Sequence, residues 1–353
     1  MQGPVRVLVL GTGSIGSEIA RVILNKPGLK LVGAFARRAE RGGLDLGTAI
    51  GLGRELGVTV GNELPELLEE AQPHVAIQAT CSTVADAVGE ISTLIRRRVH
   101  VITIAEEMAC PEAGSPEIAR ELNQLASDHG VSLLGTGVNP GFVLDLLIIT
   151  LSGVCTDIRH ISARRTNDLA MYGHSVLKAQ GVGLSRAEFQ KGLHAGSVVG
   201  HIGFRESIHM IASSIGWKID RIDENRDPII ARVARETPFV TVDPGRVAGC
   251  LHTAVGYSGD KPVIELIHPQ QVHPHLERIE TGDTIRIRGT PDINLHMRPE
   301  IPGGLATAAL AVNEIPRVLN AEPGLHTMVD LPVPAAILAD ARALIKGAAR
   351  SMA

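Results

Sequence analysis

Aromatic side chains are scarce in this chain. Of its 353 residues only 2% are Phe, Trp or Tyr, while 38 are glycine and 20 are proline. A core with so few aromatic rings must be built from Val, Ile, Leu and Ala, which is typical of α/β folds with many tight turns. The length is enough for two domains.

Concentrated basic charge and long apolar runs are also missing. The formal net charge is -4, and the densest basic tract is Arg96-Arg97-Arg98. Nucleic-acid and membrane-surface binding need a concentrated basic face, so we exclude both kinds of partner. No stretch approaches the roughly 18 consecutive apolar residues of a membrane span, and the first residues enter a strand-like segment instead of a signal peptide. We therefore expect a cytoplasmic protein.

Cysteine is rare and scattered. The four cysteines are Cys81, Cys110, Cys155 and Cys250. They form no C-x-x-C pair, so the sequence predicts neither a zinc knuckle nor a disulfide framework. We expect reduced thiols.

The first third of the chain alternates short aliphatic runs with amphipathic stretches, as successive βαβ units do. Strands are expected at residues 6–10, 29–35, 74–79, 100–104 and 131–134, and helices at 15–25, 64–71, 84–97 and 116–129. Gly130 would end the last helix. The pattern predicts an α/β fold with a Rossmann-type, doubly wound parallel sheet.

The alternation of aliphatic and amphipathic segments ends after residue 157. Strands are expected at residues 159–165, 239–242, 261–267 and 283–288, the first of them exposed, and an Ala-rich helix at 305–319. This pattern indicates a second α+β domain with a mixed sheet, followed by a return of the chain to the first domain. We expect a dinucleotide-binding domain at 1–140, completed by 305–353, and a substrate and oligomerisation domain at 141–304.

A glycine motif follows the first expected strand and opens the first expected helix. It consists of Gly11, Thr12, Gly13, Ser14, Ile15 and Gly16. This position identifies G-x-G-x-x-G as a dinucleotide site, where the first glycine allows the turn, the second admits the pyrophosphate and the third allows close packing. The free N–H groups at the helix start would face the anion.

The residues after the second expected strand bear on cofactor choice. NAD-selective sites place a carboxylate there, whereas this chain has Arg37 and Arg38. A guanidinium matches the oxygens of a 2′-phosphate, so NADP(H) is favoured. If the two arginines form only a solvated turn, NAD(H) would serve as well.

Two further strand ends should border the nicotinamide, because ligands in such sheets lie at the carboxyl ends of the strands. The expected residues are Thr80, Cys81 and Ala105. A nucleophilic Cys81 is disfavoured, because no histidine follows it at an informative spacing.

Several segments together resemble a known family. They are Gly11–Gly16, residues 103–111 (TIAEEMACP), 135–142 (GTGVNPGF), 313–317 (NEIPR) and 328–332 (MVDLP). The chain is similar in these segments to the 2,4-diaminopentanoate dehydrogenase and native amine dehydrogenase family, which is related to dihydrodipicolinate reductase. The resemblance implies an NAD(P)-dependent dimer that aminates a carbonyl with free ammonia, or deaminates the amine. The middle domain matches only loosely.

Glu106 and Glu107 carry the chemistry in this interpretation. Consecutive carboxylates at the end of a buried strand are costly unless they meet a cation or a proton, and an ammonium substrate is such a cation. Alternating strand side chains would let only one enter a pocket. From its place in the family segment we assign Glu106 to ammonia binding and proton transfer, with Glu107 supporting it. The alternative is that both glutamates cap the following turn.

The resemblance also implies substrate-binding residues. They are Asn139, Pro140 and Phe142 at the hinge into the second domain, and Tyr172, His268 and Thr307 by looser correspondence. His268 would close the strand before Pro269, where a histidine commonly caps a turn. His268, His273 and His275 could suggest a metal, but no Cys or acidic ligand at a sensible spacing completes a chelate, so we expect none.

One departure from the family concerns the substrate. Family members usually carry a basic segment after the strand containing Arg164 and Arg165, where this chain has residues 166–174, TNDLAMYGH. A preference for 2,4-diaminopentanoate is therefore not expected to carry over. Two other functions stay open: an imine or enamine reductase like dihydrodipicolinate reductase, whose His-His-x-x-K-x-D-x-P-type segment is missing here, and a non-catalytic NADP-binding regulator.

Overall fold

The computed structural model describes residues 3–346 and divides into two compact units. The first unit comprises Met1–Phe142 and Gly303–Ala353, and the second comprises Val143–Pro302. The sequence prediction placed these boundaries after residues 140 and 304. That the units serve cofactor and substrate respectively stays a proposal.

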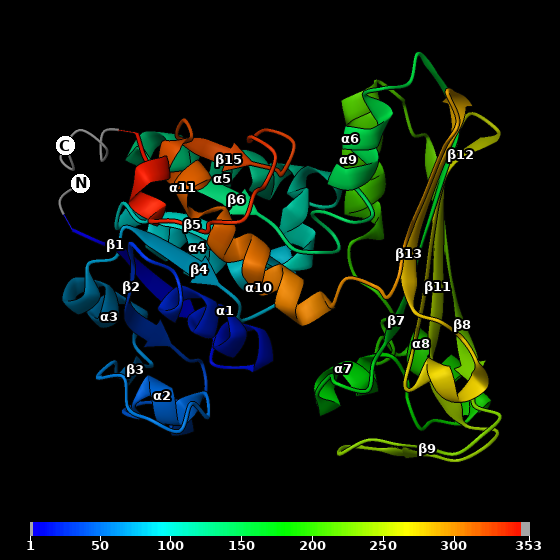
Figure 1. Ribbon diagram of the computed structural model, residues 1–353, viewed down its shortest axis with the longest axis horizontal. Helices are drawn as coiled ribbons and strands as arrows, with labels where there is room; N and C mark the ends of the chain where they lie inside the picture. The colour runs from blue at the N-terminus through cyan, green and yellow to red at the C-terminus, as the bar shows by residue number, and fades with distance from the viewer. Residues whose placement is uncertain (1–2, 347–353) are drawn as a thin grey trace. The chain divides into compact units, whose positions relative to one another are not determined.

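The first unit is a parallel sheet with helices around it (Figure 1). Its strands are β1 (Val5–Leu10), β2 (Leu29–Phe35), β3 (Val60–Gly61), β4 (Val75–Gln78), β5 (His100–Thr103), β6 (Ser132–Gly135) and β15 (Gly324–His326). Its α-helices are α1 (Ser14–Leu24), α2 (Leu46–Ala49), α3 (Leu64–Ala71), α4 (Val84–Arg96), α5 (Pro116–His129), α10 (Gly303–Asn313) and α11 (Ile315–Asn320). Its 3₁₀ turns are η1 (Ala39–Arg41), η2 (Glu106–Ala109), η3 (Pro111–Ala113) and η5 (Ala341–Leu344).

The strand order confirms the predicted Rossmann-type fold. The order is β15-β6-β5-β4-β1-β2-β3, and every neighbouring pair is parallel. The chain leaves β1 toward β2 and later crosses to β4 on the other side of β1. Ligands bind such sheets where the strand order reverses, at the carboxyl ends of β1 and β4.

Local sequence explains the helices of this unit. The α5 helix begins with Pro116, whose fixed φ suits a first turn, and ends at Gly130, which adopts the left-handed conformation at φ 71°. The expected helix at 305–319 is two helices, because the turn at Glu314 separates α10 from α11. The α10 helix lies along α1, which returns the end of the chain to the first unit (Figure 1).

The second unit consists of a large sheet, a small strand pair and helices. Its strands are β7 (Asp157–Asp168), β8 (Arg221–Ile230), β9 (Arg235–Glu236), β10 (Thr241–Val242), β11 (Val247–Ser258), β12 (Lys261–Gln271), β13 (Gly282–Thr290) and β14 (Ile293–Met297). The helical segments are α6 (Leu146–Ser152), α7 (His174–Ala179), α8 (Arg186–His194), α9 (Phe204–Ile215) and η4 (Pro274–Glu277).

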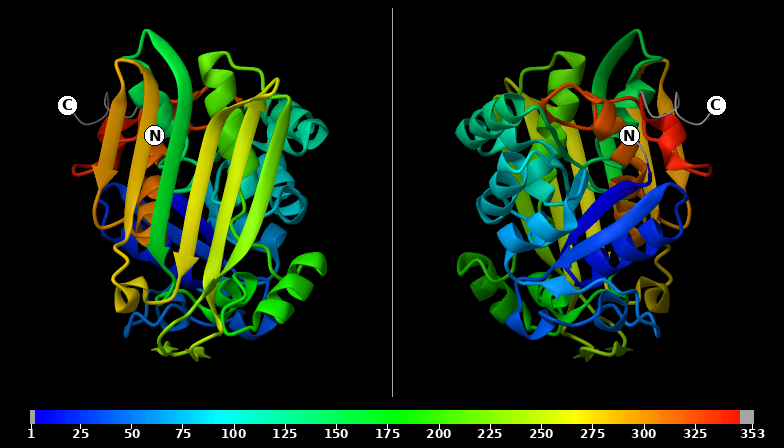
Figure 2. Two further views of the ribbon diagram at one scale, coloured as in Figure 1. Left: turned by 90° about the vertical axis from the view of Figure 1, so that its right-hand side faces the viewer. Right: turned by 90° about the vertical axis from the view of Figure 1, so that its left-hand side faces the viewer.

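The large sheet is mixed, as predicted. Its order is β14-β13-β7-β12-β11-β8, with β7 and β12 parallel and the other pairs antiparallel. The left view of Figure 2 shows the six strands side by side. The small antiparallel pair joins β9 and β10.

Three details of the predicted second domain were wrong. The strand predicted at 159–165 is an inner strand: β7 lies between β13 and β12, and Arg165 is 1% exposed, although Arg159 and Arg164 are exposed. The strand predicted at 239–242 is reduced to the two residues of β10. The β12 strand does not close at His268 but continues through Pro269 to Gln271.

Membrane crossing finds no support in the described chain. Within residues 3–346, no helix combines the length and the apolar character that a membrane span requires.

Candidate functional site

The glycine turn after β1 is closely packed at two of its glycines and open at the third. A Cβ at Gly11 would lie 2.5 Å from the Ala79 carbonyl oxygen, and one at Gly16 would lie 2.0 Å from the Gly11 carbonyl oxygen. Glycine is therefore required at both positions. Gly13 is exposed and has no atom within 4 Å of its Cβ position, so the side toward which a side chain would point is open.

The N-terminus of α1 lies beside these glycines and is the second part of the candidate pyrophosphate site. Gly13 is its N-cap and provides no side-chain oxygen to the first-turn N–H groups. Ser14 is exposed, while Thr12 and Ile15 are half-buried. Open space above uncapped N–H groups fits a pyrophosphate, because the helix start carries a partial positive charge.

Arg37 and Arg38 lie directly after β2, and the structure gives them different surroundings. Arg37 Nε donates to Glu90 Oε1 at 2.7 Å, and its terminal nitrogen donates to the Asp86 carbonyl oxygen at 2.8 Å. The Glu90 carboxylate raises the pKa of the guanidinium. Arg38 is exposed, and no ion pair is recorded for it among residues 3–346.

Glu90 belongs to a polar network under the strand ends. Its Oε2 accepts from Thr80 Oγ1 at 2.5 Å and from Gln78 Nε2 at 3.1 Å. Gln78 Oε1 accepts from Thr103 Oγ1 at 2.5 Å, and Thr103 in turn accepts from the Ala105 N–H at 3.1 Å. The network thus connects the strand ends at which Thr80 and Ala105 were predicted to border the nicotinamide. Ala105 itself is fully buried.

Cys81 lies in the same network with its thiol held neutral. Gln78 Nε2 is 2.9 Å from Cys81 Sγ, and burial raises the thiol pKa. A thiol with a raised pKa is a poor nucleophile, because the thiolate is the reactive form. This environment supports the prediction that Cys81 lines the nicotinamide site, and it disfavours covalent catalysis by the thiol.

Glu106 and Glu107 are not strand residues. The β5 strand ends at Thr103, and both glutamates lie in η2. The prediction that strand alternation separates their side chains was therefore wrong in its reason. A 3₁₀ turn advances about a third of a revolution per residue, which still points the two carboxyl groups in different directions.

Glu107 is tied to the start of α4. Its Oε2 accepts from the Val84 N–H at 2.7 Å, and its own N–H donates to the Ser82 carbonyl oxygen at 3.1 Å. A carboxylate at a helix start is stabilised by the N–H groups and by the helix dipole. Glu107 therefore holds η2 against α4 and caps that helix, not the turn that follows η2.

Glu106 has a carboxyl group that titrates near neutrality. The residue is partly exposed, yet its carboxyl group is desolvated. This burial raises its pKa to about 7 against the opposing effects of a backbone hydrogen bond and the Ser82 hydroxyl, and the nearby Glu107 charge adds to the rise. Such a group can both take up and release a proton at neutral pH, which is the property of a general acid and base.

The chain after β6 and the start of α10 meet in the first unit. The Val138 N–H donates to Thr307 Oγ1 at 3.1 Å, which places Thr307 beside the segment that contains Asn139 and Pro140. The Asn139–Pro140 peptide bond is cis, and Phe142 is half-buried. The structure therefore brings together two parts of the predicted substrate set that are far apart in sequence.

Tyr172 and His268 belong to the second unit. Burial raises the pKa of the Tyr172 hydroxyl, and the ring packs against the apolar cluster around Leu169. His268 is 3% exposed, and its Nδ1 lies 2.7 Å from the Arg165 carbonyl oxygen. Burial and the Arg165 charge lower its pKa to about 3, so the ring is neutral.

His268 is one of a group of buried rings that the sequence analysis missed. The ring centroid of His201 lies 5.0 Å from that of His268, and that of Phe204 lies 4.8 Å from those of His201 and His252. His252 Nε2 is 3.1 Å from Glu224 Oε2. The sequence signal was weak, because β11, which pairs His252 with His268, was not predicted.

Gln78 and Glu90 were also missed. Gln78 is a fully buried polar residue in a strand that is otherwise apolar, VAIQ, and that contrast was a readable signal. Glu90 gave no signal, because a glutamate on an amphipathic helix is usually solvated.

Family models match both parts of the chain. Residues 142–347 match the 2,4-diaminopentanoate dehydrogenase C-terminal domain, and residues 5–103 match the N-terminus of dihydrodipicolinate reductase. Among solved structures, dihydrodipicolinate reductase from Paenisporosarcina sp. TG-14 is 12% identical over 92% of this chain and 97% of that chain, with a TM-score of 0.51. At that identity the likeness concerns the fold alone.

Whole-chain relatives agree with these matches. The chain is 41% identical to a 2,4-diaminopentanoate dehydrogenase of Acetoanaerobium sticklandii, with 98% of each covered, and 26% identical to an amine dehydrogenase of Streptomyces virginiae, with 94% and 98% covered. An amine dehydrogenase structure from Mycobacterium smegmatis is 30% identical over 94% of this chain and 97% of that chain, with a TM-score of 0.84. The chain belongs to the 2,4-diaminopentanoate dehydrogenase family and is an oxidoreductase with an NAD(P)-type binding fold.

Proposed function

We propose that this chain is an amine dehydrogenase that prefers NADP(H). It would aminate a small ketone or aldehyde with free ammonia and catalyse the reverse oxidative deamination. The observation that carries the proposal is the Glu106 carboxyl group, whose pKa of about 7 suits proton transfer at the carboxyl end of the parallel sheet. Relatives that are named amine and diaminopentanoate dehydrogenases support the reaction class.

Glu106 has two tasks in this reaction. As a carboxylate it binds the ammonium ion and accepts a proton, which frees the nitrogen lone pair to attack the carbonyl carbon. After the attack, a proton moves from the new ammonium nitrogen to the alkoxide oxygen, which gives a neutral carbinolamine. As an acid Glu106 then returns its proton to the carbinolamine hydroxyl group, so that water leaves and an iminium forms. The chemistry that a bound nicotinamide would supply is hydride transfer, to that iminium carbon in amination and from the amine-bearing carbon in deamination. The regenerated carboxylate stabilises the positive iminium charge.

Glu107 acts as a positioning residue. Its hydrogen bond from the Val84 N–H anchors η2, and η2 determines where the Glu106 carboxyl group lies. The neutral thiol of Cys81 and the side chain of Thr80 would form a wall beside the nicotinamide. No covalent step is assigned to Cys81, because its raised thiol pKa keeps the nucleophilic thiolate scarce.

The cofactor preference rests on Arg37 and Arg38. Both follow β2, where the adenosine ribose of a dinucleotide lies in this fold, and the strand end itself carries no acidic residue to bind a free 2′-hydroxyl. Arg38 is exposed and available to a phosphate. Because Arg37 is already paired with Glu90, we propose a preference for NADP(H) in which NAD(H) is also accepted.

Substrate contacts are assigned to six residues. In the first unit these are Asn139, Pro140, Phe142 and Thr307, and in the second unit Tyr172 and His268. Phe142 would favour an apolar carbon chain. Residues 166–174 depart from the basic segment that the family resemblance implies, which disfavours 2,4-diaminopentanoate as the natural amine.

The test is a turnover screen of purified protein. Short ketones, aldehydes and keto acids are supplied with ammonia and NADPH, and loss of the reduced-nicotinamide absorbance is recorded. Ammonia-dependent oxidation of NADPH with an amine product is expected. Turnover of cyclic imines without ammonia would favour an imine reductase instead, and tight NADPH binding with no turnover would favour a regulator.

The assembly is proposed as a homodimer, from the family resemblance. Light scattering coupled to size exclusion would report twice the 37.4 kDa chain mass. A monomer would contradict this part of the proposal.

A further inference from the structure

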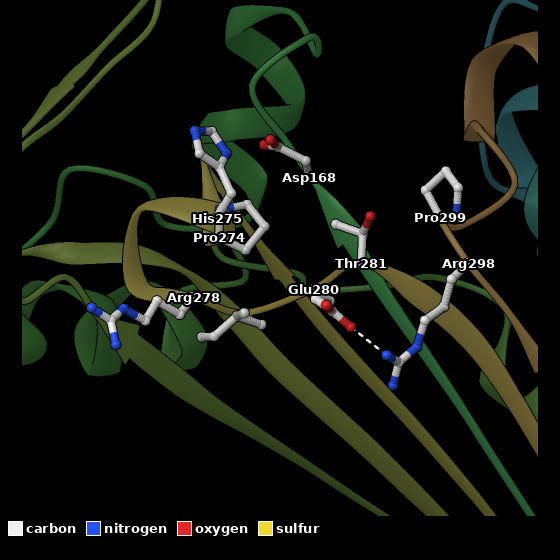
Figure 3. Close-up of a pocket in the computed structure, with 9 residues that line it drawn as sticks. Asp168, Pro274, His275, Arg278, Glu280, Thr281, Arg298 and Pro299 are labelled. Atoms are coloured by element: carbon white, nitrogen blue, oxygen red, sulfur yellow. Dashed lines mark hydrogen bonds and ion pairs between the residues drawn. The ribbon is translucent and has the colours of Figure 1, made fainter.

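Three potential metal ligands meet where β12 gives way to η4 in the second unit. Asp168 is the last residue of β7, while His273 and His275 follow β12, the neighbouring parallel strand. One ligand atom from each residue lies within 4.8 Å of the other two. Figure 3 shows the Asp168 and His275 side chains pointing toward one another at a cavity of about 760 Å³.

The two oxygens of Asp168 have different roles. Oδ1 accepts from the Ala170 N–H at 2.8 Å and from the His273 N–H at 2.8 Å, so it anchors the local backbone. Oδ2 lies 3.7 Å from His273 Nδ1, which is too far for a hydrogen bond. The carboxylate is therefore oriented by one oxygen, while the other faces the imidazole.

The His273 ring has its tautomer set by the backbone. Its Nε2 lies 2.8 Å from the Glu236 carbonyl oxygen, and a carbonyl can only accept, so Nε2 carries the hydrogen. In the neutral ring Nδ1 then presents a lone pair to Asp168 Oδ2. Two electron-pair donors facing one another across 3.7 Å attract a cation. A metal-binding histidine usually donates its other N–H to a carbonyl or carboxylate in this way.

His275 supplies the third donor. Its side chain is exposed, its ring centroid lies 5.4 Å from that of His273, and within residues 3–346 no hydrogen bond to its ring is recorded. Three charged side chains also line the cavity: Arg278, Glu280 and Arg298. Glu280 is paired with Arg298, which leaves the Arg278 charge to oppose a cation.

We propose that Asp168, His273 and His275 form a binding site for a divalent transition metal of the Zn²⁺ type. Two imidazole nitrogens and one carboxylate oxygen are ligands that Zn²⁺ accepts, and metal–ligand bonds of about 2 Å can bridge the 3.7 Å between Nδ1 and Oδ2. The open side would hold water. The sequence analysis expected no metal because no acidic residue lies near the histidines in the chain at a chelating spacing, and β7 supplies that residue through space.

The site is tested with untagged full-length protein, stripped with a chelator and returned to chelator-free buffer. Zn²⁺ is titrated by calorimetry, and Co²⁺ by its visible absorption bands. We expect about one metal per chain. Asp168→Asn and His275→Ala should each weaken binding about tenfold or more, as the loss of a ligand should cost at least what loss of a supporting group costs. His209→Ala, which removes an exposed histidine of α9, should leave it unchanged.

These variants are expected to fold. The amide introduced by Asp168→Asn retains an oxygen that can accept from the Ala170 and His273 N–H groups, so the backbone anchor is kept, and His275 is exposed. Zn²⁺ should raise the melting temperature of the unaltered protein but not of His275→Ala, since a ligand that binds the folded state stabilises it. Melting without metal confirms that each variant is folded.

Three results would overturn the site. Absence of saturable Zn²⁺ or Co²⁺ binding would mean that Asp168, His273 and His275 do not form a metal site. Unchanged binding in both variants would place the metal elsewhere. A thiolate-to-cobalt charge-transfer band would show that cysteine is the ligand.

Discussion

Arg37 is paired with Glu90 across 2.7 Å, which joins the end of β2 to α4. The Arg37 side chain is 43% exposed and that of Glu90 is 11% exposed, so the carboxylate lies in the protein while the guanidinium reaches the surface. A bound 2′-phosphate at this position would interact with an Arg37 guanidinium that is also paired with Glu90. Cofactor preference therefore depends on a residue of α4 as well as on the arginines that follow β2.

The double variant Arg37→Ala and Arg38→Ala should weaken NADPH binding far more than NADH binding, because only NADPH loses a phosphate partner. Charge-assisted hydrogen bonds contribute about 1.5–3 kcal/mol each, so a loss of roughly tenfold to a few hundredfold is expected. Fluorescence titration of both cofactors measures it. Equal weakening of both, or of neither, would assign ribose recognition to another loop.

Glu90→Gln should tighten NADPH while leaving NADH nearly unchanged. The amide retains an acceptor for Thr80 but no longer neutralises Arg37. The change in the NADPH-to-NADH ratio of dissociation constants is the measurement. Glu69→Gln is the matched control, because it breaks the exposed pair between Glu69 and Arg97 at 2.9 Å on another part of the unit. A ratio that moves equally in both variants would argue against a specific role for Glu90.

Glu106→Gln should retain the fold and NADPH affinity while turnover falls by roughly 10²–10⁴, the contribution of a positioned acid–base group. Steady-state amination and deamination rates measure this loss, with NADPH binding as the control.

Glu107→Gln is the matched variant for Glu106→Gln. It should lower stability or affinity modestly, because an amide oxygen still accepts from the Val84 N–H. If Glu107→Gln abolishes turnover while Glu106→Gln does not, the two roles are exchanged. If neither variant affects turnover, amine dehydrogenase chemistry at η2 is excluded.

The pH profile of deamination should contain a step near the Glu106 pKa of about 7. The carboxylate acts as the base, so the rate should rise as pH increases through that value and rise further as the amine substrate loses its proton. Rates measured from acid to alkaline pH should show the step near pH 7 in the unaltered enzyme but not in Glu106→Gln. Persistence of that step in Glu106→Gln would assign it to another group.

Stability should show the opposite dependence. Because folding raises the Glu106 pKa from 4.5 to about 7, the neutral form stabilises the fold at low pH, and this contribution is lost as pH rises between those values. Denaturant unfolding across this range should give a more positive slope of stability against pH for Glu106→Gln than for the unaltered protein, because the contribution of the buried histidines is common to both. An equal slope in both proteins would contradict the assigned pKa.

His268 should make the fold sensitive to acid. Its pKa is lowered to about 3 in the folded protein, so the unfolded chain takes up a proton first as pH falls below about 6.5. Stability should therefore decrease by up to about 1.4 kcal/mol per pH unit from this group. In the variant His268→Asn, the amide can donate to the Arg165 carbonyl oxygen. This variant should lack the contribution of His268 to the change of unfolding free energy with pH. The exposed His209→Asn should not, and identical slopes in both variants would refute the role of His268.

The sequence by itself determined the architecture of the first unit. The glycine motif, the alternation of strands and helices, and local signals such as Pro116 and Gly130 specify the parallel sheet and several helix boundaries. These signals act within a few residues of one another, so they can be read along the chain. The resemblance of short segments also indicated the family, which the relatives confirmed.

The structure of the second unit was harder to predict from sequence. The β7 strand carries several charged residues and was expected to be exposed, yet it is an inner strand in which Arg165 pairs with Asp283 at 2.6 Å. A buried charge of this kind is stable only with a partner, and that partner lies on β13, 118 residues away in the chain. Neighbours of this sort cannot be inferred from the spacing of residues along the chain.

Tertiary structure alone decided the environment of the functional groups. The sequence placed Glu106 and Glu107 side by side, but only the fold ties Glu107 to the start of α4 and leaves Glu106 with a desolvated carboxyl group. It likewise pairs Arg37 with Glu90 and brings Asp168 to His273. Residue type fixes what chemistry a side chain is capable of, whereas burial and neighbouring charge, which come from distant segments, set its protonation and its partner.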